Sequence, residues 1–149
     1  MPGYKAHLLC GVAVGAGAVF AARALDVYRP EPLQMLALTA ITAAAALFPD
    51  VDTNSVARRF FYGLLAALDI VLISHKRYEW AALVGLASML PAIGDHRGWT
   101  HTWWAMLAVP LVIFAVPASL FGVEPRLLVP YLSATVLGYG THLVLDRQF

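Results

Sequence analysis

The stretch from Thr102 to Phe121 is predominantly apolar and carries no charged side chain. An apolar run of about 20 residues is long enough to cross the hydrocarbon core of a bilayer as a helix. The rest of the chain shares this character, because 60% of its 149 residues are hydrophobic and only 13% are charged. A soluble domain has about 25% charged residues. The sequence therefore predicts an integral membrane protein, and its length predicts one membrane-embedded domain over residues 1–149.

Apolar runs separated by proline, glycine and charged residues predict an all-α bundle of about six transmembrane helices. The expected spans are about 5–24, 33–48, 56–74, 79–93, 102–121 and 127–146. Asp69 interrupts the third span. Strands are not expected, because open sheet edges are not tolerated in lipid and the alternation of a β-barrel is absent. Glycine pairs at 11 and 15 and at 138 and 140 predict close approach of helix backbones, although glycine is common in membrane helices generally.

Six alternating crossings bring most of the histidines to the side of the membrane that holds the N-terminus. Only His75, between the third and fourth spans, falls on the other side. The residues that share the first side are His7, Asp50, Asp52, His96, His101, His142 and Asp146. Five lysines and arginines fall on each side, so the positive-inside rule does not predict the orientation.

Two acidic motifs within this set favour metal binding. His142 and Asp146 are four residues apart, so both lie on one face of a helix and can bind one metal ion or two neighbouring ions. A hydrogen bond that locks the helix end is the alternative. Pro49 ends the second helix, and an extended turn would let Asp50 and Asp52 reach one cation. Asp52 is also a good N-cap type for the third helix, as are Asn54 and Ser55.

A third motif, His96-Arg97-Gly98-Trp99-Thr100-His101, places two imidazoles around a glycine-containing turn. Arg97 could clamp a phosphate or a carboxylate in bidentate fashion. The tryptophans at 99, 103 and 104 are typical of an aromatic belt at the membrane–water boundary. A single cysteine excludes an intrachain disulfide and a cysteine-based zinc cluster, and a net charge of +1 gives no reason to expect nucleic-acid binding.

Together these motifs resemble the YdjM-like family of inner-membrane-associated, metal-dependent hydrolases. The family pattern is approximately an N-terminal His, L-P-D-x-D, H-R-G-x-T-H-S and G-x-x-x-H-L-x-x-D, and the corresponding residues cover nearly the whole chain. Thr102 stands where the family usually has Ser. The His-x-x-x-Asp element is also similar, more distantly, to that of zinc-dependent phospholipase C and its related single-strand nucleases, a resemblance that implies phosphoester hydrolysis.

The resulting hypothesis is a prokaryotic inner-membrane hydrolase that uses one to three divalent metal ions, zinc in the first place. Metal ligands are expected at His7, Asp50, His101, His142 and Asp146, with Asp52 and His96 as further ligands or as residues that orient them. Asp52 or Asp50 would act as general base, and Arg97 with Arg58 or Arg59 would hold an anionic head group. A phospholipid or another lipid-like phosphoester is the expected substrate. Two alternatives remain: a metal-ion transporter, and a non-enzymatic membrane adaptor with a structural metal site.

Overall fold

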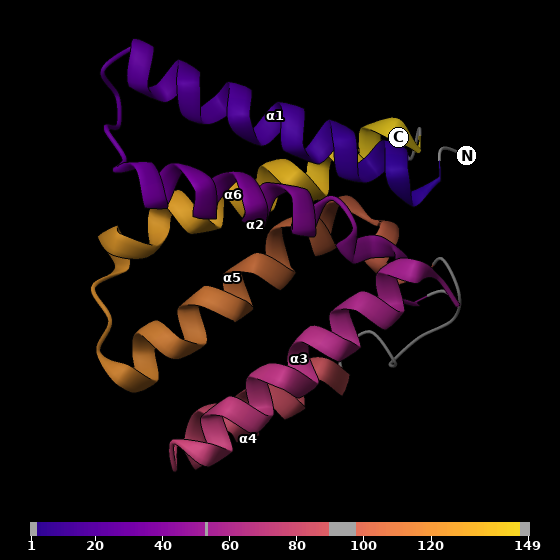
Figure 1. Ribbon diagram of the computed structural model, residues 1–149, viewed down its shortest axis with the longest axis vertical. Helices are drawn as coiled ribbons and strands as arrows, with labels where there is room; N and C mark the ends of the chain where they lie inside the picture. The colour runs from indigo at the N-terminus through magenta and orange to yellow at the C-terminus, as the bar shows by residue number, and fades with distance from the viewer. Residues whose placement is uncertain (1–2, 53, 90–97, 147–149) are drawn as a thin grey trace. The chain divides into compact units, whose positions relative to one another are not determined.

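The computed structural model describes residues 3–52, 54–89 and 98–146, and every regular element within them is helical (Figure 1). The prediction of an all-α protein is confirmed for this part of the chain. The elements in chain order are α1 (Tyr4–Ala24), α2 (Pro32–Ala45), η1 (Phe48–Asp52), α3 (Val56–Ser74), α4 (Tyr78–Met89), η3 (Trp99–His101), α5 (Trp103–Phe121) and α6 (Pro125–Leu145). The predicted end of the fourth helix, at Ile93, lies outside the described residues.

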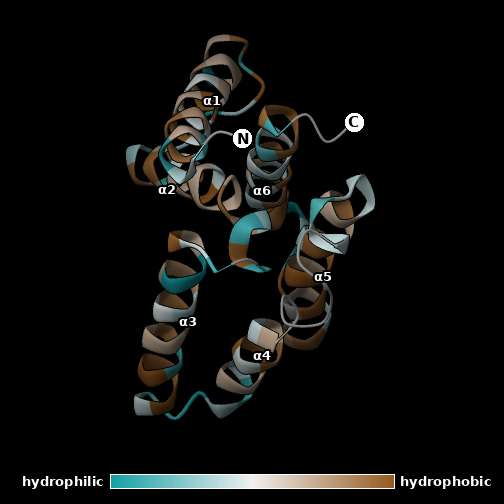
Figure 2. Cartoon of the chain, turned by 90° about the vertical axis from the view of Figure 1, so that its right-hand side faces the viewer, coloured by the Kyte–Doolittle hydropathy of each residue, from teal (hydrophilic) through white to brown (hydrophobic). Residues whose placement is uncertain are grey.

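Three helices, α1, α5 and α6, are long and apolar enough to cross a membrane. Figure 2 shows α5 as largely hydrophobic along its length. The apolar helix α2 has 14 residues and α4 has 12, so both are shorter than the usual span of about 20. The 19-residue helix α3 carries two arginines in its first turn and Asp69 further on. The chain therefore has three candidate spans among its described residues, and a total of six stays a prediction.

The chain divides into two compact units, and the two are considered separately. Unit 1 comprises Met1–Pro49 and His101–Phe149, and therefore contains α1, α2, α5 and α6. Unit 2 comprises Asp50–Thr100 and contains α3 and α4. The prediction of one domain over the whole chain stays a prediction.

Glycines allow α2 to pack closely against both α1 and α6 in unit 1. A Cβ atom on Gly11 of α1 would lie 2.8 Å from the Cβ of Ala46, and one on Gly15 would lie 2.9 Å from the Cβ of Thr42. A Cβ atom on Gly138 of α6 would overlap the carbonyl oxygen of Thr42. The predicted close approach of helix backbones is thus confirmed at these positions, and α2 is the shared partner.

The connection after α2 differs from the extended turn expected after Pro49. Phe48–Asp52 form the short 3-10 helix η1 instead. Proline can enter the first turn of such a helix, because its fixed φ suits a helical conformation and the first amide groups have no intrahelical acceptor. Among the three predicted caps of the next helix, Ser55 is the N-cap of α3, and its hydroxyl accepts a hydrogen bond from the Arg58 amide at 3.1 Å.

Unit 2 is held together by contacts between α3 and α4 and by one between its first and last segments. The Tyr62 hydroxyl on α3 donates to the Ser88 carbonyl on α4 at 3.1 Å. The buried Thr100 hydroxyl donates to Oδ2 of Asp52 at 2.6 Å. Asp52 and Thr100 are 48 positions apart in the sequence, so this hydrogen bond joins the first and last segments of unit 2.

Candidate metal centre

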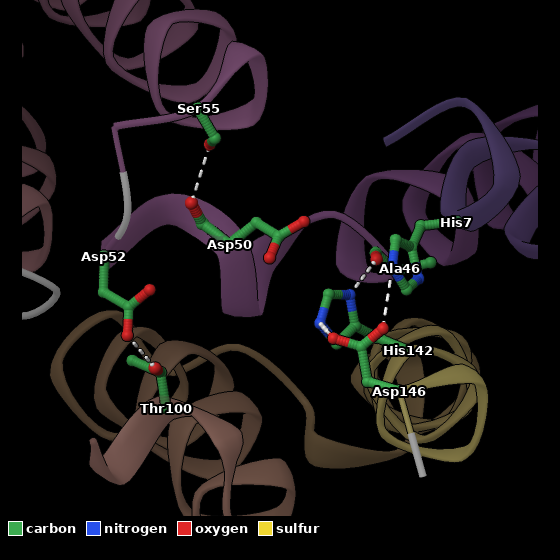
Figure 3. Close-up of polar contacts among 8 residues, drawn as sticks. All are labelled: His7, Ala46, Asp50, Asp52, Ser55, Thr100, His142 and Asp146. Carbon is green, nitrogen blue, oxygen red and sulfur yellow. Dashed lines mark hydrogen bonds and ion pairs between the residues drawn. The ribbon is translucent and has the colours of Figure 1, made fainter. Parts of the chain in front are cut away.

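His142 is completely buried on the last turn of α6 and is held in one orientation by the backbone of α2. Its Nδ1 atom lies 2.8 Å from the carbonyl oxygen of Ala46 (Figure 3). A carbonyl oxygen only accepts hydrogen bonds, so Nδ1 carries the hydrogen and donates it. In the neutral ring, Nε2 then presents its lone pair. Histidines that bind metal ions in proteins are commonly oriented in this way, with the second ring nitrogen donating to a carbonyl or carboxylate.

His7 lies against His142 from the first turns of α1. The two rings are stacked, with centroids 4.1 Å apart and planes inclined by 20°. Nε2 of His7 lies 3.2 Å from Oδ1 of Asp146. Nδ1 of His7 is buried and has no hydrogen-bond partner among the described residues. A buried ring nitrogen without a partner is costly, so this position favours a bound ligand.

Asp146 follows the last residue of α6 and places its carboxylate beside the Nε2 atoms of both stacked histidines. Its side chain is only 5% exposed, and Oδ2 lies 3.6 Å from Nε2 of His142. The C-terminal end of a helix carries partial negative charge, so a buried carboxylate at this position is unfavourable without a nearby cation. A metal ion or a protonated imidazole would supply the positive charge that this position requires.

His101 completes the group from η3, directly before α5. It is 9% exposed, and its ring centroid lies 5.3 Å from that of His142 at an angle of 64°. His101, His142 and Asp146 each offer a ligand atom within 4.8 Å of the others, so they could hold a metal ion. With His7 they form a buried cluster of three imidazoles and one carboxylate, which we call the His/Asp cluster. Nitrogen and carboxylate ligands of this kind suit zinc and non-haem iron.

The other predicted site residues belong to unit 2 or lie outside the described residues. Asp50 and Asp52 are both in η1, where the Asp50 carbonyl accepts a hydrogen bond from the Ser55 hydroxyl at 2.8 Å. Arg58 and Arg59 are exposed in the first turn of α3, and the Arg58 guanidinium lies 5.8 Å from the centroid of the Tyr62 ring. His96 and Arg97 lie outside the described residues. Participation of these residues in the site stays a prediction.

Two groups with a clear structural role escaped the sequence reasoning. The Ala46 carbonyl, which orients His142, is a backbone atom and leaves no signal in the choice of amino acid. Thr100 had such a signal, because it stands between Trp99 and His101 in the motif singled out for its histidines. A third residue of that region, Thr102, serves as N-cap of α5 and accepts a hydrogen bond from the Ala105 amide at 3.4 Å. Serine and threonine both serve as N-caps, so the exchange relative to the family pattern preserves this role.

The described part of the chain is all-helical, with three helices able to span a bilayer and a buried His/Asp cluster, and these features define a helical membrane protein with a candidate metal centre. More specifically, the chain belongs to the YdjM inner membrane protein family, which it matches over residues 1–148. The family resemblance inferred from the motifs is thereby confirmed. No curated protein and no solved structure matches the chain.

Proposed function

We propose that this protein is a metal-dependent hydrolase of the prokaryotic inner membrane that acts on a phospholipid or a related lipid phosphoester. The observation that carries this proposal is the His/Asp cluster. It is buried, it contains a histidine oriented by the Ala46 carbonyl, and it contains a carboxylate at a helix C-terminus that requires a cation. The family name supports the location in the inner membrane.

His7, His101, His142 and Asp146 would hold a divalent cation, and zinc is the ion that we propose. Such an ion would lower the pKa of a bound water molecule and so supply a nucleophile near neutral pH. Asp50 and His96 are proposed as further ligands, which would allow one to three ions. Asp52 is proposed as the general base, and its hydrogen bond from Thr100 would fix the direction in which the carboxylate points.

A lipid substrate agrees with the depth at which the His/Asp cluster is expected. Trp103 and Trp104 follow His101 by two and three positions, and both are exposed at the start of α5. Exposed tryptophans at a helix end are typical of the boundary between hydrocarbon and head groups. The cluster would then lie at head-group depth. Arg58, Arg59 and Arg97 are proposed to hold the anionic head group. In this arrangement α2, α3 and α4 would each cross the membrane as well, which gives six crossings, although α2 and α4 are short.

Metal transport is a second candidate, and Asp69 is the observation that favours it. This residue lies within α3, and its Oδ1 atom is buried without a hydrogen-bond partner among the described residues. Oδ2 would lie 3.9 Å from a Cβ atom on Gly85 of α4, so the carboxylate faces the neighbouring helix. Ionisable residues within membrane helices often mark ion pathways. Replacing Asp69 with Asn should abolish metal uptake into vesicles if the protein is a transporter, and should leave hydrolysis unchanged if it is a hydrolase.

The proposal is tested on purified protein in detergent or lipid bilayers. Metal content is measured first, and hydrolysis of phospholipids, lipid phosphomonoesters and simple esters is then followed before chelation, after chelation and after addition of zinc. We expect activity to disappear on chelation and to return with the metal. His142→Ala should be inactive, whereas His75→Ala, which changes an exposed histidine after α3, should retain activity. Hydrolysis that is absent throughout, or unaffected by chelation and by His142→Ala, would exclude the proposed function.

A further inference from the structure

A cavity of about 500 Å³ lies among α1, α2 and α6, within unit 1. It is lined by the second half of α1 from Gly15 onward and the connection that follows it, by Leu38 and Thr42 of α2, and by α6 between Arg126 and Leu137. The His/Asp cluster uses other parts of the same helices, namely the start of α1 and the end of α6. Arg126 and His142 are 16 positions apart on α6, or about 24 Å along an ideal helix. Leu137, at the other edge of the cavity, is five positions from His142, and none of the four cluster residues lines the cavity.

The wall of this cavity is mainly apolar, with a cation at one end. Its apolar residues include Val19, Leu38 and Val129, which suit a hydrocarbon chain. Arg126, in the first turn of α6, is exposed and forms no ion pair with any acidic residue that the structure describes. A charged group beside an apolar cavity in a membrane protein matches an amphiphile with an anionic head and an apolar tail.

Two further groups at the cavity, the Ser133 hydroxyl and the Arg126 carbonyl, are available for hydrogen bonds. Ser133 lines it, and its hydroxyl makes no hydrogen bond to any described residue, whereas Thr135 and Thr141 on the same helix donate to the carbonyls four residues earlier. Pro130 lies inside α6 and has no amide hydrogen, so it cannot donate to the Arg126 carbonyl. The polar groups of the cavity are thus not all used within the helix.

We propose that this cavity binds one acyl chain of an anionic phospholipid whose phosphate contacts the Arg126 guanidinium. Arginine binds phosphate through two parallel hydrogen bonds, and cavities of 300–1,000 Å³, on the order of this one, are usual for small-molecule ligands. A second cavity of about 610 Å³, between α5 and α6, has Glu124 in its wall and no cation, so it does not match an anionic lipid. The proposed lipid is bound intact at the end of α6 remote from His142, and its binding does not depend on the proposed hydrolase activity.

The head-group contact is tested by titrating delipidated protein in a neutral detergent with phosphatidylglycerol or with phosphatidylcholine of the same acyl chains. Bound lipid is counted by native mass spectrometry, without added metal. We expect tighter binding of phosphatidylglycerol, because the ammonium group of phosphatidylcholine offsets the charge of its phosphate, and we expect Arg126→Gln to weaken phosphatidylglycerol about fivefold and phosphatidylcholine less. Arg29→Gln is the control, because Arg29 is an exposed arginine that pairs with Asp26 and does not line the cavity. Equal binding of both lipids, or equal effects of the two variants, would overturn the proposal.

The position of the acyl chain is tested by filling the cavity. Ala18→Phe and Ser133→Phe, on α1 and α6, should each reduce the amount of phosphatidylglycerol bound, since both positions line the cavity. Ala16→Phe adds the same ring at an exposed position of α1 outside the cavity and should bind lipid normally. Size-exclusion chromatography and circular dichroism establish that each variant is folded. If both cavity variants bind as much lipid as the Ala16→Phe control, the chain does not occupy this cavity.

Discussion

The two ring nitrogens of His142 have different roles, and a hydrogen bond to a single backbone carbonyl fixes which nitrogen has which role. Because Nδ1 donates to the carbonyl oxygen of Ala46, Nε2 is the atom directed to Asp146. His7 stacks on this ring and restricts its rotation further. The cluster is therefore held in position by contacts among protein groups that do not involve an ion, which reduces the cost of ordering the ligands.

Replacing His142 with Ala should remove most of the bound metal from the purified protein. Loss of a residue that only orients a metal ligand typically lowers the metal affinity by roughly 10–100-fold. Loss of His142, which is itself a proposed ligand, should lower the metal affinity by more. Elemental analysis of folded protein gives the metal content per chain. His75→Ala is the matched control and should retain its metal, because His75 is exposed and lies outside the cluster. Equal metal content in the two variants would show that the cluster is not the metal site.

Asp52 and Thr100 allow the role of a general base to be separated from that of a ligand. If Asp52 is the base, Asp52→Asn should lower turnover about 10²–10⁴-fold and leave the metal content unchanged. Thr100→Val removes the 2.6 Å hydrogen bond to the carboxylate and should lower turnover less, again with the metal retained. Metal content and rate are measured together on each variant. Loss of metal in Asp52→Asn would instead identify Asp52 as a ligand, with Asp50 as the remaining candidate base.

At the scale of elements, the stability of unit 1 depends on how closely α2 approaches its neighbours. Thr42 on α2 is 1% exposed, and it lies beside Gly15 of α1 and Gly138 of α6. In lipid, where hydrophobic burial gives little driving force, helices associate through such close packing of small residues. The carbonyl that orients His142 belongs to the residue that follows α2, so this packing also positions the cluster.

Gly138→Ala should destabilise the protein, because the added Cβ would overlap the Thr42 carbonyl oxygen. Overpacking of a tight contact typically costs about 1–3 kcal/mol. Thermal or denaturant unfolding in detergent measures the change. Gly17→Ala on α1 is the control, since a Cβ atom there meets nothing within 4 Å and alanine favours a helix over glycine, so this variant should be at least as stable as the unmodified protein. Identical unfolding of the two variants would contradict the proposed role of Gly138.

At the scale of the whole molecule, the contact between the start of α1 and the end of α6 restricts the number of times the chain can cross the membrane. Within unit 1, the start of α1 and the end of α6 lie together, since His7 contacts Asp146. An even number of crossings between these two points is required if α1 and α6 both span. Among the residues that the structure describes, three candidate spans meet the criteria of length and composition, and α2 packs against two of them.

Six crossings predict that Asn54 is on the same side as the N-terminus and that Asp26 and His75 are on the opposite side. Each residue is replaced singly with Cys in a background in which Cys10 is replaced with Ser, and an impermeant thiol reagent is added to intact cells and to inverted vesicles. Asn54→Cys should react from one side only, and the other two should react from the other side. Reaction of Asn54→Cys and His75→Cys from the same side would exclude α3 as a crossing and, with it, the six-span arrangement.

The sequence by itself determined the helical class, the membrane environment, the family, and the limits of elements such as Val56–Ser74, because hydropathy and helix caps are local properties of the chain. The sequence also predicted that His7, His101, His142 and Asp146 lie on one side, from six alternating crossings that themselves stay a prediction, and the structure brings these four residues together. Only the tertiary structure decided the hydrogen bond from His142 to Ala46, the pairing of Asp52 with Thr100, and the cavity beside Arg126. These features depend on which helices pack together and at what distance, and on backbone atoms that are the same in every residue, so they leave no pattern in the order of side chains.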